Sequence, residues 1–294
     1  MLRDLAAGKV KIGPDIVLAV IPVFNIGGML NRGSFSRANQ NGPGAYGFRG
    51  NARNLDLNRD FIKMDARETR SLVGLFHRLD PDLFIDNHVS NGADYQHVMT
   101  LLSTQKDKFA FGAYLENELE PAIYAGMKKK GYDLVPYVNH WGHTPDSGWQ
   151  QFYEGPRFAS GFTTLFGSFG FVPETHMLKP YASRVKATYE LMTTFIALPA
   201  VKGGEIRRMR TQAMSVPADH ILRWRADTVQ FRWIPFKGYE ARYEPSEVSG
   251  QPRLFYDRKR PYTKQVKFFN HYLPAVCIHA GSHVFPLGLL IIQP

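Results

Sequence analysis

The sequence predicts an α/β fold in which helices flank a mixed sheet, followed by a small β-rich C-terminal region. Strand-like apolar runs alternate with helix-like segments through residues 1–200, a pattern typical of sheets covered by helices. Beyond Gly203 and Gly204, short strand-like stretches separated by Pro and Gly replace this pattern. Hydrophobic residues form 44% of the 294-residue chain and charged residues 21%, so the chain can bury a core. We expect a main domain over 1–200 and a β-rich region over 201–294.

The first expected elements surround a long loop. Residues 16–24 are a continuous aliphatic run with β-branched side chains, which predicts a buried strand. Periodicity then stops over 25–60, a stretch with seven Gly and one Pro, and loops of this length in compact domains are usually functional. Residues 65–79 have apolar side chains at helical spacing, with Asp65 as the expected N-cap.

The later elements continue the alternation of strands and helices. They are, in order, a strand over 83–87, a helix over 107–130, a loop-rich stretch over 139–161, a strand over 169–173 and a helix over 181–198.

Composition excludes several classes of protein. No window approaches the roughly 18 consecutive apolar residues that a membrane span needs, so no membrane partner is expected. Cys277 is the only cysteine, which excludes an intrachain disulfide and a multi-cysteine metal cluster. The first ten residues lack the long apolar run and the cleavage site of a signal peptide, and the sequence leaves the localisation undefined.

The positive charge of the chain is unevenly distributed. Lys and Arg number 36 against 26 Asp and Glu, a net charge of +10. Residues 1–199 carry 21 basic and 19 acidic side chains, whereas residues 200–294 carry 15 and 7. A basic region can bind nucleic acid, but these Lys and Arg are scattered through strand-like segments, as on a solvated face. Because no nucleic-acid motif accompanies them, we do not expect a nucleic-acid partner.

The loop over 25–60 is the first of three polar features that lie near strand ends, where α/β folds place their sites. Four of its arginines, Arg37, Arg49, Arg53 and Arg59, lie within about two dozen residues. Guanidinium groups bind carboxylates in bidentate fashion, so the loop is suited to holding a carboxylate ligand. The alternative is a solvated loop whose arginines pair with Asp56 and Asp60.

The other two features are a histidine and a glutamate at the ends of predicted strands. His88 follows the strand over 83–87, with Asp86 two residues before it, a usual arrangement of a metal ligand and its support. Glu174 ends an apolar strand, and apolar surroundings raise the pKa of a carboxyl group, as a general base requires. The alternatives are an ordinary hydrogen-bonded histidine and a capping or ion-paired glutamate.

Taken together and in this order, the three features resemble the zinc metallocarboxypeptidases of the carboxypeptidase A type. The resemblance covers about residues 1–200 and depends on four segments: IPVFNIGG, the arginine loop ending in DLNRDF, D-N-H after the next strand, and the downstream strand with its Glu. It implies hydrolysis of a C-terminal peptide or related amide bond, with zinc as cofactor and a peptide-like substrate with a free carboxylate as partner. It also implies that full-length relatives are exported.

The resemblance assigns a role to each catalytic candidate. His88 would be a zinc ligand, one of the three protein ligands that accompany a water at a catalytic zinc. Glu174 would be the general base that takes a proton from the zinc-bound water and passes it to the leaving amine.

The resemblance also implies the substrate-binding residues. Asn58 and Arg59 would bind the terminal carboxylate of the substrate. Arg37 would polarise the scissile carbonyl and stabilise the oxyanion that develops on it. Arg49 or Arg53 could take that place instead, because both lie in the same loop.

The zinc motif itself is absent from the sequence. The other two ligands of the family come from H-x-x-E, and none of the ten histidines here precedes a Glu by three residues. His140 and His143, in H-W-G-H, are substitute candidates, but no Glu is in register with them. We expect an N-terminal truncation or a mis-assigned start, which would leave the chain inactive and poorly soluble. The alternative function is a non-catalytic protein that binds peptide carboxylates.

Overall fold

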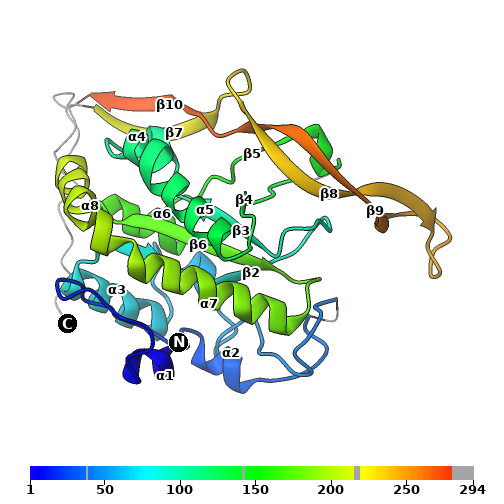
Figure 1. The fold of residues 1–294 in the computed structure, drawn as a ribbon, viewed down its shortest axis with the longest axis horizontal. Helices are drawn as coiled ribbons and strands as arrows, with labels where there is room; N and C mark the ends of the chain where they lie inside the picture. The colour runs from blue at the N-terminus through cyan, green and yellow to red at the C-terminus, as the bar shows by residue number, and fades with distance from the viewer. Residues whose placement is uncertain (38, 141–142, 215–218, 280–294) are drawn as a thin grey trace.

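A mixed sheet with helices on both faces forms the centre of the computed structural model (Figure 1). The structure describes residues 1–37, 39–140, 143–214 and 219–279. The described helices are α1 Leu2–Ala6, α2 Ile26–Leu30, α3 Arg67–Leu79, α4 Gly112–Tyr114, α5 Glu120–Lys129, α6 Ala159–Thr163, α7 Tyr181–Ala197 and α8 Pro199–Ala213. The described strands are β1 Leu83–Ile85, β2 His88–Ser90, β3 Met99–Ser103, β4 Val135–Pro136, β5 Trp149–Gln150, β6 Phe169–His176, β7 Asp219–Ala226, β8 Arg232–Pro245, β9 Pro252–Phe269 and β10 Tyr272–His279.

Strand β6 is the central strand of this sheet. It pairs in parallel with β1 and then with β2 along one edge, and antiparallel with β3 along the other. Strand β3 in turn pairs in parallel with β4. The predicted fold class, α/β with a mixed sheet flanked by helices, is confirmed.

Alternating side chains of the sheet build a core on each face, as the two-residue period of a strand requires. One core joins β6 to α5 and α7 and includes Phe169, Phe171, Ile123 and Leu191. The other lies under α3 and α6 and includes Phe76, Phe162 and, from β1, the partly buried Phe84. Strand β6 supplies Phe169 and Phe171 to the first core, and its Gly170 packs closely against Ser160 of α6 on the other face, so the strand is covered on both sides.

The region after α8 is rich in β-structure. Strands β8 and β9 form a long antiparallel ribbon that projects from the body (Figure 1). At its base, β9 pairs with β5, and Phe236 and Phe268 pack with Tyr95 and Trp149 of the main region. The region predicted over 201–294 therefore shares a core with the rest of the chain, and its residues 215–218 and 280–294 lie outside the described part.

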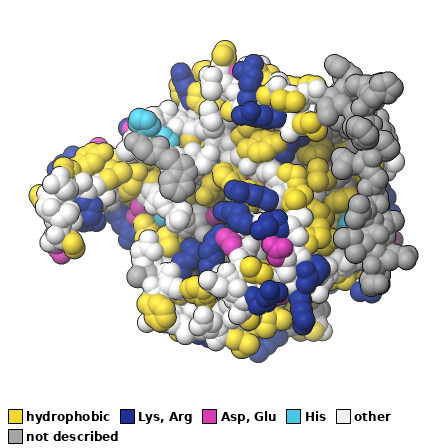
Figure 2. Space-filling view, turned by 180° about the vertical axis from the view of Figure 1, so that it is seen from behind, with side chains coloured by type: hydrophobic (Ala, Val, Ile, Leu, Met, Phe, Trp, Pro, Cys, Tyr) yellow, Lys and Arg dark blue, Asp and Glu magenta, His cyan; other side chains and the backbone are white. Residues whose placement is uncertain are grey.

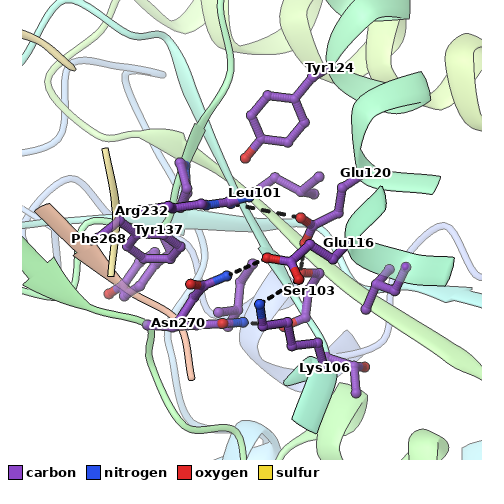
Figure 3. A pocket seen from close by; sticks show the side chains of 15 residues that line it. Leu101, Ser103, Lys106, Glu116, Glu120, Tyr124, Tyr137, Arg232, Phe268 and Asn270 are labelled. Carbon is purple, nitrogen blue, oxygen red and sulfur yellow. Dashed lines mark hydrogen bonds and ion pairs between the residues drawn. The ribbon is translucent and has the colours of Figure 1, made fainter. Parts of the chain in front are cut away.

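A polar cluster also joins the ribbon to the body (Figure 3). Lys106 forms an ion pair with Glu116, which accepts a hydrogen bond of 3.1 Å from Asn270 Nδ2. Arg232 Nη2 lies 3.9 Å from Glu120 Oε2. Because two acidic and two basic side chains face one another, the buried charges are compensated within the cluster.

The prediction of a strand over residues 16–24 is wrong. No strand forms there, and the segment is largely exposed, with Val17 90% exposed. A strand needs a neighbour that satisfies its N–H and C=O groups, and no described strand pairs with this segment. The apolar residues of this segment therefore predicted a buried strand, but the segment pairs with no described strand of the sheet.

Two helix boundaries also differ from the prediction. Helix α3 begins at Arg67, and its N-cap is Ala66 and not the predicted Asp65. The Asp60 carboxylate accepts hydrogen bonds from the backbone N–H of Asp65 (2.9 Å) and Ala66 (3.0 Å), the two residues that precede the helix. Helix α8 continues through Gly203 and Gly204, where the sequence predicted the change to strands. Among the described helices, none has the length and apolar character to cross a membrane.

Candidate functional site

The pairing of β2 with β6 places His88 beside Glu174. The two residues are partners in the parallel register, although 86 positions separate them in the chain. His88 Nδ1 lies 3.9 Å from Glu174 Oε1, and His88 Nε2 lies 2.9 Å from Asp86 Oδ2. The structure thus brings together the predicted histidine, its neighbouring aspartate and the predicted glutamate.

The position of Glu174 follows from the sequence of β6. Residues of this strand are buried on both sides, and Glu174 is the exception, half-buried near the C-terminal end. The carboxyl ends of parallel strands are where open sheets place their sites. The apolar part of the strand is held in the core, and Glu174 reaches the surface of that core.

His88 is held in its charged form by the surrounding carboxylates. Burial by itself would lower its pKa, but the charge and hydrogen bond of Asp86 and the charges of Glu174 and Glu154 raise the pKa of His88 to about 9. At neutral pH the ring is therefore an imidazolium with carboxylate oxygens near both nitrogens.

For Glu174, burial outweighs the effect of the neighbouring charges on the pKa. Burial is the largest effect and raises its pKa to about 6, with Asp86 acting in the same direction. The positive charges of His88, Arg37 and Arg49 lower the pKa and so limit the rise. A carboxyl group with a pKa near 6 is well matched to accept a proton at neutral pH.

A zinc centre does not fit the described residues. His88 supplies one imidazole, and the Asp86 carboxylate lies at hydrogen-bond distance from its Nε2. Among the described residues, no group of three or more His, Cys, Asp or Glu is placed to hold a metal ion. The His140 and His143 rings lie 6.0 Å apart and form no such group. His88 as a zinc ligand stays a prediction.

The end of the arginine loop is ordered by its own acidic residue. Asp56 caps the short 3₁₀ turn Leu57–Arg59 by accepting a 3.0 Å hydrogen bond from the Asn58 backbone N–H. The Arg59 guanidinium lies 4.4 Å from the centre of the Phe158 ring and donates to the Asn58 carbonyl. Burial lowers the pKa of Arg59. Asn58 and Arg59 are therefore presented together and half-buried.

The other arginines of the loop differ in their partners. Arg49 forms an ion pair of 2.9 Å with Asp56. The charges of Arg37 and Arg49 act on Glu174, whereas Arg53 lines a separate hollow with Arg67. The charge of Arg37, the predicted carbonyl-polarising residue, thus acts on the predicted general base.

Glu154 is a site residue that the sequence did not reveal. It is 5% exposed, and its Oε2 atom is buried without a hydrogen-bond partner among the described residues. Burial raises its pKa to about 8, with the His88 charge acting against the rise and Asp86 and Glu174 adding to it. It precedes Arg157, whose guanidinium lies 4.9 Å from the Phe158 ring. The loop around Glu154 has no periodic pattern. The only sequence signal for its burial is the pair of aromatic residues before it, Phe152 and Tyr153.

Two arginines of α8 form ion pairs within the chain. Arg210 pairs with Asp80 and Asp82, and Arg207 lies 3.3 Å from Asp82. Seen from behind, basic side chains gather near the middle of the molecule with a few acidic ones among them (Figure 2). These pairings give no support to the nucleic-acid alternative.

Comparisons with known proteins find a partial likeness in structure. Neither a family model nor a curated protein matches the sequence. A metallo-carboxypeptidase from Burkholderia cenocepacia is similar over 51% of this chain and 41% of its own, with 16% identity and a TM-score of 0.39. A metallo-carboxypeptidase from Pseudomonas aeruginosa, in complex with (2-guanidinoethylmercapto)succinic acid, is similar over 55% and 43%, with 18% identity and a TM-score of 0.40. The chain thus spans less than half the length of these enzymes.

Proposed function

We propose that this chain binds peptides or peptide-like molecules by their free C-terminal carboxylate, at the arginine loop beside His88 and Glu174. Arg37, Asn58 and Arg59 are the proposed contacts. The observation that carries the proposal is that the guanidinium groups of Arg37 and Arg59 have no carboxylate partner within ion-pair distance among the described residues, while Arg49 of the same loop is paired.

The chemistry of Arg59 favours an anionic ligand. Its guanidinium is half-buried against an aromatic ring, and burial has already lowered its pKa. A carboxylate that binds it in bidentate fashion restores the favourable interactions that water would have made, and does so with two parallel hydrogen bonds. The half-buried amide of Asn58 lies next to it and offers a further donor.

A second candidate function is hydrolysis of the C-terminal amide bond, the activity that the resemblance implies. It is favoured by Glu174, a half-buried carboxyl group at a strand end with a pKa of about 6, which suits a general base. Zinc is the cofactor of this proposal, with His88 as one ligand, and the remaining ligands would have to come from outside the described residues.

Matched ligands and matched variants test carboxylate binding. Benzoyl-glycyl-phenylalanine should bind more tightly than its C-terminal amide in calorimetric titrations. Arg59→Gln and Arg37→Gln should each weaken binding of the acid by roughly tenfold or more, because each removes a charge-assisted hydrogen bond, and leave binding of the amide unchanged. Arg53→Gln, in the same loop but facing a different hollow, is the control.

The outcomes separate the candidates. Equal binding of acid and amide by the wild-type chain would refute the carboxylate proposal, and a loss caused by Arg53→Gln would show that the wrong arginines have been assigned. Cleavage of the acid with added Zn²⁺, abolished in Glu174→Gln, would support the hydrolytic function. Acid-selective binding without cleavage would leave binding as the function of this chain.

A further inference from the structure

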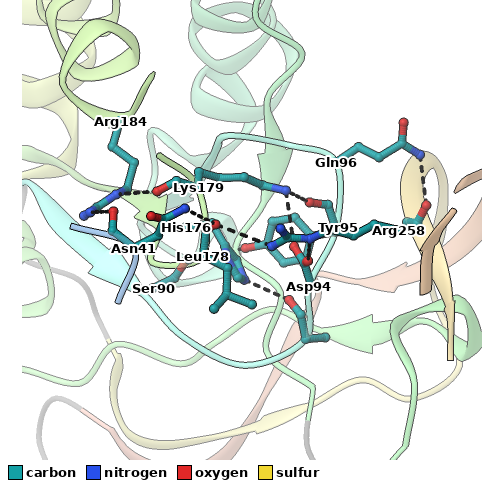
Figure 4. Close-up of polar contacts among 12 residues, drawn as sticks. Asn41, Ser90, Asp94, Tyr95, Gln96, His176, Leu178, Lys179, Arg184 and Arg258 are labelled. Carbon is teal, nitrogen blue, oxygen red and sulfur yellow. Dashed lines mark hydrogen bonds and ion pairs between the residues drawn. The ribbon is translucent and has the colours of Figure 1, made fainter. Parts of the chain in front are cut away.

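Arg184 is a buried arginine that contacts backbone carbonyls of two separate segments (Figure 4). It lies in the first turn of α7 and is 4% exposed. Its Nε donates a hydrogen bond of 3.0 Å to the Lys179 carbonyl, just before the helix. Its Nη2 donates to the carbonyl of Asn41, at 2.9 Å, and to that of Gly42. One guanidinium therefore joins the end of the β6 segment to the arginine loop.

The partners of Arg184 are unusual for a buried charge. No carboxylate lies within ion-pair distance of its guanidinium among the described residues, and burial lowers its pKa. Burying a charge is costly unless it is well hydrogen-bonded, so the three carbonyls, together with the Tyr181 ring whose centre lies 5.5 Å from the guanidinium, stabilise this charge. Because Arg184 contacts backbone atoms of the loop, these hydrogen bonds depend on the conformation of the loop backbone and not on its side chains.

The loop is docked at the same place by its own backbone. Asn41 donates from its backbone N–H to the Met177 carbonyl at 2.8 Å, and from Nδ2 to the Leu178 carbonyl at 3.4 Å. Gln40 N–H donates to the Arg37 carbonyl at 2.8 Å. Arg37 is thus tied through one turn to the point at which Arg184 holds the loop.

The segment that Arg184 holds is itself fixed from the other side. Lys179 Nζ lies 3.2 Å from Asp94 Oδ1, and it also donates to the Tyr95 carbonyl. Arg258 Nε, from the ribbon strand β9, donates to Asp94 Oδ2 at 2.6 Å (Figure 4). Arg184 therefore joins the loop to a part of the structure that is already fixed.

We propose that Arg184 is a positioning residue that holds the arginine loop against the end of β6, so that Arg37 is kept in place for the carboxylate of a bound ligand. This inference rests on the proposed carboxylate-binding function. Arg184 does not touch the ligand in it. Without Arg184 the loop loses its hydrogen bonds at Asn41 and Gly42, and the turn that contains Arg37 is no longer held against the end of β6.

The test compares Arg184 with a second largely buried arginine. Arg184→Gln should weaken binding of benzoyl-glycyl-phenylalanine by about tenfold and leave binding of its amide unchanged, and Arg184→Lys should give an intermediate loss. Amide hydrogens of residues 39–47 should exchange faster in Arg184→Gln. The control is Arg210→Gln on α8, where the side chain is 13% exposed and pairs with Asp80 and Asp82. It should lower the melting temperature without changing the preference for the acid.

Each result bears on a different statement. If the wild-type chain prefers the acid and Arg184→Gln keeps that preference, the inference about Arg184 is wrong and the proposed function stands. Equal losses in Arg184→Gln and Arg210→Gln would reduce Arg184 to a general contributor to stability and would also overturn the inference. If the wild-type chain shows no preference, the proposed function falls and the positioning role falls with it.

Discussion

Replacing Phe169 by alanine is expected to lower the free energy of unfolding by about 3–5 kcal/mol, the usual cost of truncating a buried aromatic side chain. Phe169 is 0% exposed at the start of β6. Its ring centre lies 4.3 Å from that of Phe111 and 6.1 Å from that of Tyr114. Rings so close on two sides leave little freedom for the surroundings to fill the cavity.

Urea denaturation of the wild-type chain and of Phe169→Ala gives the measurement. Phe35→Ala is the matched control, because Phe35 is 78% exposed and surface substitutions usually change stability by no more than about 0.5 kcal/mol. A loss in Phe169→Ala as small as that in the control would contradict the placement of β6 in the core. Since β6 also carries Glu174, such a result would weaken the whole description of the site.

Much of the sheet and its helices could be predicted because their signals are local. The strand near 169–173 and the helix near 181–198 correspond to β6 and α7 within a few residues. Helical spacing and a short apolar run next to turn residues are properties of neighbouring positions. The segment 16–24 has an equally strong apolar signal, but whether it forms a strand depends on a partner elsewhere in the fold, which its own residues do not encode.

The site could be predicted in part for a similar reason. His88 and Glu174 each appear at the end of a predicted strand, so their placement on the sheet follows from the sequence. Their pairing in register is a long-range property of β2 and β6. Arg184 uses backbone carbonyls as partners, and any residue supplies a carbonyl, so no sequence signal marks its contacts. Glu154 is buried by a loop without periodicity.

The second large effect is expected for Glu154→Gln, whose free energy of unfolding should differ from that of the wild-type chain by an amount that depends on pH. The pKa of Glu154 is raised from 4.5 to about 8, mainly by burial. Between these values the folded chain keeps a proton that the unfolded chain has lost, so this group's contribution to stability falls as pH rises. Glu154→Gln removes the titration. The stability of the variant relative to the wild type should therefore increase between pH 5 and pH 8, by at most about 1.4 kcal/mol per pH unit.

Urea denaturation of both proteins at pH 5, 6.5 and 8 measures this difference. The charged groups that act on Glu154 are His88, Asp86, Glu174 and Lys108. All four are present in both proteins, and because Glu154 also raises the pKa of His88, part of the measured difference comes from His88. Glu247→Gln, at an exposed position of the turn between β8 and β9, is the control for adding a glutamine.

The result also bears on carboxylate binding. A growing difference would mean that Glu154 is protonated at neutral pH and does not neutralise the positive charge of Arg59, on which it acts. That guanidinium would then keep its full attraction for a ligand carboxylate. A difference that stays constant with pH would mean that Glu154 is already ionised, and a buried carboxylate would then compete with the ligand for Arg59. Acid-selective binding should in that case be weak at neutral pH, and the proposed function would depend on Arg37 instead.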